Sequence, residues 1–403
     1  MNRLFTFVSM PAAGHVTPTL PLVAELVRRG HRVRYGTADP MLDAVAAAGA
    51  EPVALPYVFP SGPPAPGPDG APPSKEMLEA RLAVFSKSVE DVFPVLVDEL
   101  TANPPAVVCG DALGPVGALA AQRAGLPYAG LHPSFAGNEH FSLRERMLAT
   151  EDPMGQAMAA AFAAVGDRDA EFARSQGLQP FWFGDTGDLD LVFVPREFQI
   201  AGDTFGPPWV FTGPDLGSRA DDEWTPPAPL HPDGPLVLIS LGTAFNARPD
   251  FFRMCAEAFR DSPWQVVMSI GNRVDPAELG ELPDNVVALP FVPQIPVLRR
   301  ASVFVTHNGM NSTLEALYLG VPQVGVPQML EQDLNAERVE ELGCGRRLDP
   351  RTLDAATLRA TVDEVAGDPS YRAAAEKFGA RMHEVDAPAL GADALEELAR
   401  SRD

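Results

Sequence analysis

The chain of 403 residues contains little cysteine and no long apolar run. Its three cysteines, Cys109, Cys255 and Cys344, are odd in number and far apart, which excludes a disulfide framework and a zinc site built from paired C-x₂-C motifs. We therefore expect a protein of the reducing cytoplasm. No stretch of about 18 apolar residues is present, and Pro11 interrupts the apolar segment 4–10, so we expect neither a membrane span nor a secretory signal.

Positive charge is also scarce, because 31 basic side chains stand against 54 acidic ones and the formal net charge is −23. Such a surface repels polyphosphates, which argues against nucleic acid or an anionic membrane as a partner. A phosphate group that binds here must be held locally, by backbone amides and individual side chains. The hydrophobic content of 46% is that of a globular protein, and the length favours two or three domains.

The order of the apolar runs predicts an α/β fold. The first strand, 4–8, leads into a helix that we expect Thr17 to cap, and a second strand follows at 32–37. Strands that alternate with helices imply a parallel sheet. Further strands are expected at 52–55, 106–109, 128–131 and 190–194, and in the second half at 236–239, 265–270, 286–289, 303–306 and 324–326.

Proline and glycine concentrate between the two halves, in residues 216–235, which is the composition of an interdomain linker. We expect Rossmann-like domains at 1–215 and 236–385, with a C-terminal helix at 386–403 that packs back on the first. Open parallel sheets bind ligands at the carboxyl ends of their strands. Two such domains are therefore expected to face each other across a ligand-binding cleft.

The first strand is not followed by the glycine-rich G-x-G-x-x-G turn of dinucleotide-binding proteins, and no P-loop lysine is present. The turn instead ends in His15, a candidate general base. Asp111 follows another strand at the same sheet edge, where its carboxylate can orient the imidazole and stabilise its protonated form. The alternatives are that His15 fills a turn and that Asp111 caps a helix.

A more specific group of residues follows the strand at 303–306. His307 and Gly309 lie in the turn, and Gly309 permits close approach of the backbone to a ligand. The next helix begins near Asn311, Ser312 and Thr313, and the unpaired amides and dipole of a helix N-terminus attract a diphosphate. Glu315 lies one turn further on, within reach of a ribose diol. The alternative is that Asn311 or Ser312 simply caps a structural helix.

Three weaker signals lie at other strand ends of the second half. The turn Ser240, Leu241, Gly242 and Thr243 is suited to a phosphate. The segment with Phe291, Val292 and Gln294 offers an aromatic face and polar groups to a nucleobase, although core packing of Phe291 is an equal alternative. Glu331 and Gln332 are suited to binding sugar hydroxyls, or to a solvated loop.

These motifs, in this order and over nearly the whole chain, resemble the inverting, metal-independent GT-B glycosyltransferases. The resemblance is greatest to the bacterial macrolide glycosyltransferases of the oleandomycin type. Two residues depart from the family pattern: Phe291 stands where members commonly have tryptophan, and Glu331 where they usually have aspartate. The first leaves a smaller stacking surface, and the second puts the preferred donor sugar in question.

The resemblance implies roles for the residues named above. His15 would be the base on the acceptor hydroxyl, with Asp111 as its partner. Donor contacts are implied for the base (Phe291 and Gln294), the diphosphate (Thr243, His307, Asn311 and Ser312), the ribose (Glu315) and the sugar (Glu331 and Gln332). From their position after the strand at 128–131, His132 and Phe135 are expected to contact the acceptor, together with the loop 60–73.

The implied reaction moves a hexose, glucose in the first instance, from a UDP-sugar or a TDP-sugar to a hydroxyl of an apolar natural product such as a macrolide or polyphenol. No cofactor or metal is expected, and the partners are the two small molecules. The implied reaction is compatible with a role in macrolide tailoring and with one in self-resistance. The sequence leaves the oligomeric state open. The alternatives are a metal-dependent transferase using the acidic pairs Asp167/Asp169 or Asp188/Asp190, a nucleotide-sugar epimerase, and a non-catalytic sugar-nucleotide binder.

Overall fold

The computed structural model describes residues 2–58, 75–150, 153–182, 185–217, 219, 223–227, 230, 234–243 and 246–402. The loop 60–73 lies outside these residues. The chain forms two compact units: unit 1 comprises Met1–Asp215 with Val385–Asp403, and unit 2 comprises Leu216–Glu384. The segment expected as a linker is therefore grouped with the second unit, and the C-terminal helix with the first.

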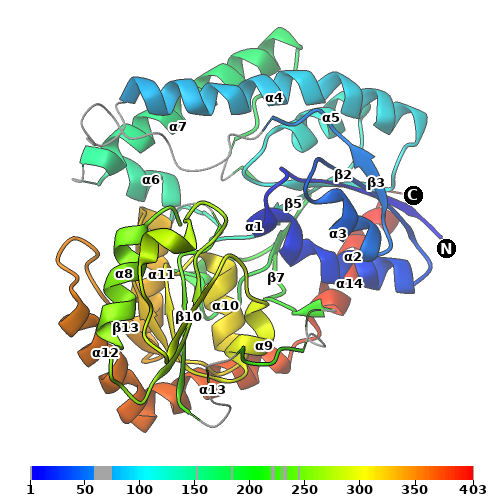
Figure 1. Cartoon of the computed structure of the whole chain (residues 1–403). Coiled ribbons are helices and arrows are strands. Elements are labelled where there is room, and N and C mark those ends of the chain that lie inside the picture. Colours follow the sequence, from blue (N-terminus) through cyan, green and yellow to red (C-terminus); the bar gives the residue numbers. More distant parts are fainter. Residues whose placement is uncertain are drawn as a thin grey trace. The chain divides into compact units, whose positions relative to one another are not determined.

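Unit 1 is built on a seven-stranded parallel sheet in the order β3-β2-β1-β4-β5-β6-β7 (Figure 1). Its strands are β1 (Leu4–Val8), β2 (Arg32–Thr37), β3 (Glu51–Ala54), β4 (Val107–Asp111), β5 (Tyr128–His132), β6 (Leu189–Val192) and β7 (Trp209–Phe211). Its helices are α1 (Ala13–Val16), α2 (Leu20–Arg28), α3 (Leu42–Ala47), α4 (Lys75–Ala102), α5 (Val116–Ala124), α6 (Leu143–Leu148), α7 (Pro153–Ser175) and α14 (Ala387–Arg400), with the 3₁₀ turns η1 (Thr17–Thr19) and η3 (Gly202–Thr204).

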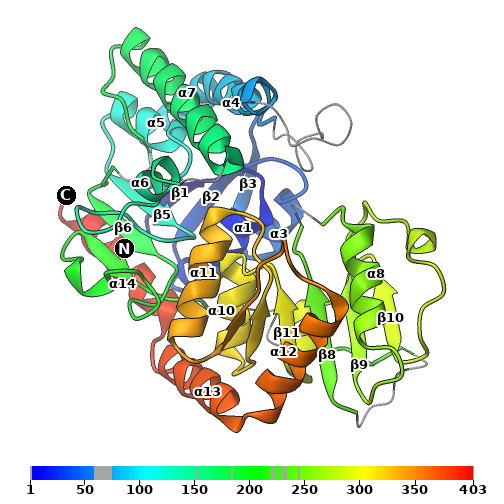
Figure 2. The ribbon, with the colours of Figure 1, turned by 90° about the vertical axis from the view of Figure 1, so that its left-hand side faces the viewer.

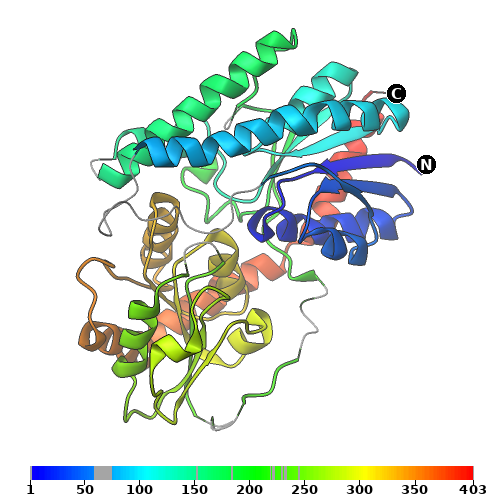
Figure 3. The same ribbon diagram turned by 45° about the horizontal axis from the view of Figure 1, so that its top comes forward.

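Helices cover both faces of this sheet, because successive strand residues point to opposite sides. Phe5 and Phe7 of β1 pack with α2, α3 and α14 on one face. Val8 packs with α4 and α5 on the other, where α7 lies along α4 (Figures 1 and 3). The C-terminal α14 thus completes the apolar layer beneath α2, although more than 350 residues separate them in the sequence.

The helix that follows β1 starts earlier than its sequence pattern predicts. Helical structure begins at Ala13, and Thr17 has right-handed helical dihedral angles inside the helical run. The predicted capping role of Thr17 is therefore wrong. The earlier start places His15 within the first helical turn after the strand.

Unit 2 carries a six-stranded parallel sheet in the order β10-β9-β8-β11-β12-β13 (Figure 2). Its strands are β8 (Leu236–Ser240), β9 (Gln265–Ser269), β10 (Val286–Leu289), β11 (Ala301–Thr306), β12 (Gln323–Gly325) and β13 (Gly345–Arg347). Its helices are α8 (Pro249–Ala258), α9 (Gln294–Leu298), α10 (Met310–Tyr318), α11 (Leu330–Glu341), α12 (Ala355–Gly367) and α13 (Pro369–His383), with the 3₁₀ turn η5 (Pro276–Leu279). Helices α8 and α12 pack on one face, and α9 and α10 on the other.

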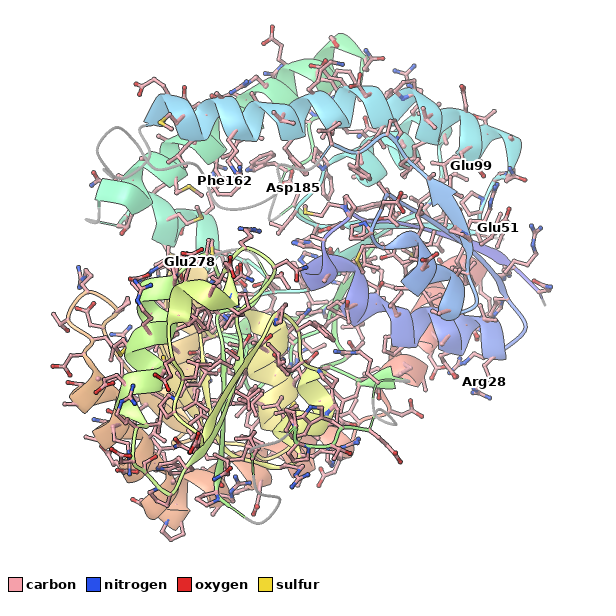
Figure 4. The ribbon with its side chains drawn as sticks, viewed as in Figure 1. Arg28, Glu51, Glu99, Phe162, Asp185 and Glu278 are labelled. Carbon is pink, nitrogen blue, oxygen red and sulfur yellow. The ribbon has the colours of Figure 1, made fainter. Side chains whose placement is uncertain are left out.

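The outer strand β3 of unit 1 carries a charged residue, Glu51, as well as Val53, which packs on the core. Arg34 of β2 pairs with Glu51 of β3 and with Glu99 near the end of α4, and Figure 4 shows these two carboxylates close together. Charges at a sheet edge discourage pairing with another chain. Arg28 of α2, by contrast, points outward and pairs with Glu25 on its own helix (Figure 4).

A buried carboxylate lies between the two long helices of unit 1. Asp169 of α7 is almost completely buried near Ser86 of α4, and its Oδ2 has no hydrogen-bond partner among the described residues. Burial raises the pKa of Asp169 to about 6, only partly opposed by Ser86 and Arg168. Because the pKa is higher in the folded than in the unfolded chain, this group favours the folded state at low pH. That advantage is lost as the pH rises from about 4 to above 6.

We expect Asp169→Asn to raise the free energy of unfolding at pH 7.5 by about 1–3 kcal/mol, since the buried charge is removed. The gain should shrink below pH 5, where the wild-type carboxyl becomes protonated. Urea denaturation at several pH values measures both effects. Asp167→Asn, at an exposed position of the same helix, is the control and should change little. Destabilisation by Asp169→Asn at pH 7.5 would show that the carboxylate is compensated in the folded state.

Candidate active site

His15 and Asp111 meet at the carboxyl edge of the unit 1 sheet. Strands β1 and β4 are neighbours, with Val8 opposite Gly110, so the residues that follow them emerge side by side. The chain turns from β1 into α1, which carries His15, and its Nδ1 lies 2.8 Å from Oδ2 of Asp111. The His15 side chain is 18% exposed and that of Asp111 only 5%. The two residues thus form a dyad with a buried carboxylate and a partly accessible imidazole.

The Asp111 carboxylate is fixed by further donors. The backbone N–H of Leu113 donates to Oδ1 and the hydroxyl of Ser9 donates to Oδ2, each at 3.0 Å. Burial acts to raise the pKa of Asp111, but His15 and these hydrogen bonds together outweigh it, and the pKa lies below its ordinary value. Asp111 is therefore ionised at neutral pH. A carboxylate beside Nδ1 favours the tautomer with its proton on Nδ1, in which Nε2 is the proton acceptor.

The residues expected to contact the acceptor are packed inside unit 1. His132 ends β5, and its Nε2 lies 2.8 Å from Oδ1 of the fully buried Asp190 on β6. Phe135 is buried and stacks on Phe198, with ring centroids 5.9 Å apart. The prediction of acceptor contacts for His132 and Phe135 finds no support in this packing. Position in the sequence could not reveal the Asp190 partner, which lies on the neighbouring strand.

In unit 2, the turn after β11 is organised by Asn308, a residue that the sequence patterns did not single out. Its φ of +56° lies in the left-handed region, which asparagine tolerates better than most residues. Its side-chain amide donates to Oγ1 of Thr313 and to Oε1 of Gln323. Its backbone carbonyl accepts from the side-chain amide of Asn335. Asn308 thus ties β11, β12, α10 and α11 together and fixes the direction in which α10 begins.

The His307 imidazole lies between two glycines. A Cβ on Gly242, whose φ is +70°, would lie 2.5 Å from Cε1 of His307, and a Cβ on Gly309 would lie 2.5 Å from Nε2. A side chain at either position would displace the imidazole. Nδ1 is buried with no hydrogen-bond partner among the described residues, and burial lowers the pKa of His307 to about 4. The imidazole is therefore neutral at pH 7.

The N-terminus of α10 is not capped by a side chain. Gly309 is the N-cap residue, and Asn311 and Ser312 lie inside the helix, so neither provides the structural cap considered as an alternative. No acidic residue lies in the first turn to neutralise the positive end of the helix dipole. Thr313 is buried and belongs to the Asn308 network, so its predicted contact with a ligand would have to come from its backbone.

Glu315 of α10 is the centre of a polar cluster. Gln294 of α9 donates to its Oε2 at 2.6 Å, and Arg219 donates to its Oε1 at 2.5 Å. The Gln294 amide also donates to Ser312 Oγ, at 3.3 Å. Arg219 lies in the segment read as a linker, so its residue type gave no signal for a site. The carboxylate is buried, ionically paired and oriented by two different elements.

Phe291 and Val292 precede this cluster in the sequence and differ in their exposure to solvent. Val292 is buried, whereas Phe291 is 77% exposed, which is unusual for an aromatic side chain. Core packing, the equal alternative for Phe291 on sequence alone, does not occur. An exposed ring near Gln294 is a surface on which a planar ligand can stack.

The other residues predicted to bind the nucleotide sugar lie at the carboxyl ends of β8 and β12. Ser240 Oγ accepts from the N–H of Gly242, and the exposed Thr243 accepts from Arg273 through its carbonyl. Gln332 accepts from the N–H of Gln328, while Glu331 is half-buried in the first turn of α11. The sheet order changes direction between β8 and β11, and open α/β sheets bind ligands at such a point.

Neither acidic pair forms an open carboxylate site. Asp167 and Asp169 lie within α7, where Asp169 is buried against α4. Asp190 is paired with His132, and Asp188 accepts from the N–H of Tyr128 and from Arg402. Among the described residues, no group of three or more histidine, cysteine or acidic side chains is arranged to hold a metal ion, and no helix is long and apolar enough to cross a bilayer.

Comparison with known proteins identifies the class. Residues 260–398 match the family described as "Erythromycin biosynthesis protein CIII-like, C-terminal domain". The chain is 38% identical over 371 residues to the NDP-glycosyltransferase YjiC of Bacillus licheniformis, covering 91% of this chain and 90% of that protein. It is 32% identical over 395 residues to the oleandomycin glycosyltransferase of Streptomyces antibioticus, covering 96% and 89% of the two chains.

The fold agrees with the sequence relationship. The crystal structure of the calicheamicin glycosyltransferase CalG4 superimposes with a TM-score of 0.79 at 34% identity, covering 99% of this chain and 98% of that one. The two parallel Rossmann-like sheets are therefore those of a GT-B glycosyltransferase, as the sequence predicted. The protein belongs to the macrolide glycosyltransferase-like NDP-glycosyltransferases, which act on natural products.

Proposed function

We propose that the protein transfers glucose from UDP-glucose to a hydroxyl of an apolar natural product, with inversion at the anomeric carbon and without a metal ion. The observation that carries the proposal is the dyad of unit 1, in which His15 Nδ1 lies 2.8 Å from an ionised, buried Asp111. An imidazole oriented in this way removes a proton through Nε2 and is stabilised as the imidazolium by the carboxylate.

In the proposed reaction, Nε2 of His15 takes the proton of the acceptor hydroxyl as its oxygen attacks the anomeric carbon. The bond from that carbon to the diphosphate oxygen breaks on the opposite face, and the electron pair leaves with the nucleotide. The uncapped N-terminus of α10 and the neutral His307 stabilise the departing diphosphate by hydrogen bonds and by the helix dipole. A single displacement gives a product of inverted configuration.

Donor recognition is assigned to unit 2. The exposed ring of Phe291 and the amide of Gln294 receive the base, and Glu315 accepts hydrogen bonds from ribose hydroxyls. Thr243, Asn311 and Ser312 contact the diphosphate, and Glu331 and Gln332 bind the sugar. UDP is favoured over TDP because a relative that is 30% identical is named as a UDP-glucosyltransferase, although another, at 34%, is a mycarosyltransferase. Three buried cysteines without disulfides agree with a cytoplasmic location.

The test is turnover of UDP-glucose and TDP-glucose, each in EDTA, against macrolides, flavonoids and simple phenols, with products identified by mass spectrometry. The expected result is one hexose added to an acceptor, faster from UDP-glucose and unchanged by EDTA. The anomeric coupling in the proton spectrum of the product reports inversion. Loss of activity in EDTA would overturn the metal-free mechanism. UDP binding with no glycoside from any donor or acceptor would instead indicate a non-catalytic binder.

A further inference from the structure

A hydroxyl group lies directly behind the dyad of unit 1. Ser9, which follows β1, is 1% exposed, and its Oγ donates to Asp111 Oδ2 at 3.0 Å. This is the same oxygen that lies 2.8 Å from His15 Nδ1. Because the N–H of Leu113 donates to Oδ1, the two hydrogen-bond donors hold the carboxylate at both of its oxygens.

The sheet register explains why Ser9 reaches this position. Val8 lies opposite Gly36 of β2 and Gly110 of β4, so the next residue on β1 lies between the ends of both neighbouring strands. The N–H of Ser9 donates to the carbonyl of Gly36 and prolongs the ladder by one residue. Its hydroxyl is therefore held by regular sheet structure rather than by a loose turn.

A second buried hydroxyl lies on the neighbouring strand. Tyr35 of β2 is fully buried, and its hydroxyl lies 2.9 Å from Thr19 Oγ1, whose own proton is donated to the carbonyl of Val16. Since an ionised carboxylate only accepts hydrogen bonds, the single proton of Ser9 must point toward Asp111. The orientation of the donor is thus fixed by its surroundings, as preorganisation of a catalytic group requires.

We propose that Ser9 is a positioning residue for the transfer reaction. Its hydroxyl keeps Asp111 Oδ2 aimed at His15 and shares the negative charge that this oxygen offers to the imidazole. The inference rests on the proposed role of His15 as the base. Without the Ser9 hydroxyl, the carboxylate is held less firmly, which lowers kcat. While Oδ2 faces His15, its negative charge is no longer shared with Ser9. The imidazolium is then stabilised and the neutral imidazole, which takes the acceptor proton, is less populated.

The test is Ser9→Ala, measured as kcat and both KM values across pH 5–9. We expect kcat to fall about 5- to 20-fold, each KM to stay within about twofold, and the acid limb of the rate profile to move up by about 0.3–1 pH unit. The acid limb moves to higher pH because the rate requires neutral His15 and the variant stabilises its protonated form. Ser9→Thr keeps the hydroxyl and should recover most of the rate.

Thr37→Val is the matched control. Thr37 ends β2, is fully buried, and its Oγ1 has no hydrogen-bond partner among the described residues, so this variant removes a hydroxyl of similar burial. It should leave kcat and the pH profile unchanged. In an Asp111→Asn background, Ser9→Ala should cause little further loss of kcat, because the partner that it positions is already altered.

The outcomes separate this inference from the proposed function. Full activity and an unchanged acid limb in a folded Ser9→Ala protein would overturn the role of Ser9, provided that His15→Ala is inactive. Equal losses for Ser9→Ala in the wild-type and Asp111→Asn backgrounds, with no shift in the pH profile, would also overturn it and indicate a purely structural contact. Full turnover by His15→Ala would instead overturn the proposed base, and the Ser9 inference with it.

Discussion

Replacement of His15 by alanine is expected to lower kcat by about 10²–10⁴-fold, the usual contribution of a general base. The acceptor hydroxyl must lose its proton as it attacks, and the base assigned to this step is the imidazole that lies 2.8 Å from the ionised Asp111 carboxylate. Binding of UDP should be unchanged, because the nucleotide contacts are assigned to unit 2. Steady-state kinetics and calorimetric titration of UDP measure the two quantities on the same preparation.

His31→Gln is a suitable control for the loss of a histidine. His31 precedes β2, at the opposite end of the sheet from His15, and pairs with Glu396 of α14. Its replacement should leave kcat within about twofold. Added imidazole, which can enter the space left by the missing ring, should restore part of the activity of His15→Ala. If His15→Ala keeps wild-type kcat, the base has been wrongly assigned.

The positions of His15 and Asp111 were predictable because they depend on a general property of parallel sheets. Apolar runs marked β1 and β4, and residues that follow neighbouring parallel strands emerge at the same edge. The same reasoning located the turn after β11. Regular alternation of strands and helices therefore predicts which strand ends can form a site, provided that the strands are long enough to be recognised.

What the sequence did not predict depends on contacts between strands or on weak patterns. Strands β7 and β13 have only three residues each, and β13, Gly345–Arg347, contains no apolar side chain. Ser9 and Asn308 look like ordinary turn residues until the register places their partners beside them. The pairing of His132 with the buried Asp190 was not predicted either, because 58 residues separate the two in the sequence.

Replacement of Glu315 by alanine is expected to raise the KM for UDP-glucose by about 10- to 100-fold. A hydrogen bond to a charged group contributes about 1.5–3 kcal/mol, which corresponds to that range. The buried carboxylate is held by Gln294 and Arg219, so it is already oriented before the ribose arrives. The KM for the acceptor should stay within about twofold, because the acceptor is assigned to unit 1.

A comparison of UDP-glucose with its 2′-deoxyribose analogue tests whether Glu315 acts on the ribose itself. The wild-type enzyme should prefer the ribose form, and Glu315→Ala should lose most of that preference because the acceptor of the 2′-hydroxyl is gone. Gln294→Ala removes a neighbour of the carboxylate but leaves the carboxylate in place. It should therefore weaken the binding of both nucleotide sugars and retain the preference for the ribose form. An equal loss for both donors in Glu315→Ala would mean that Glu315 acts only by holding Gln294 and Arg219.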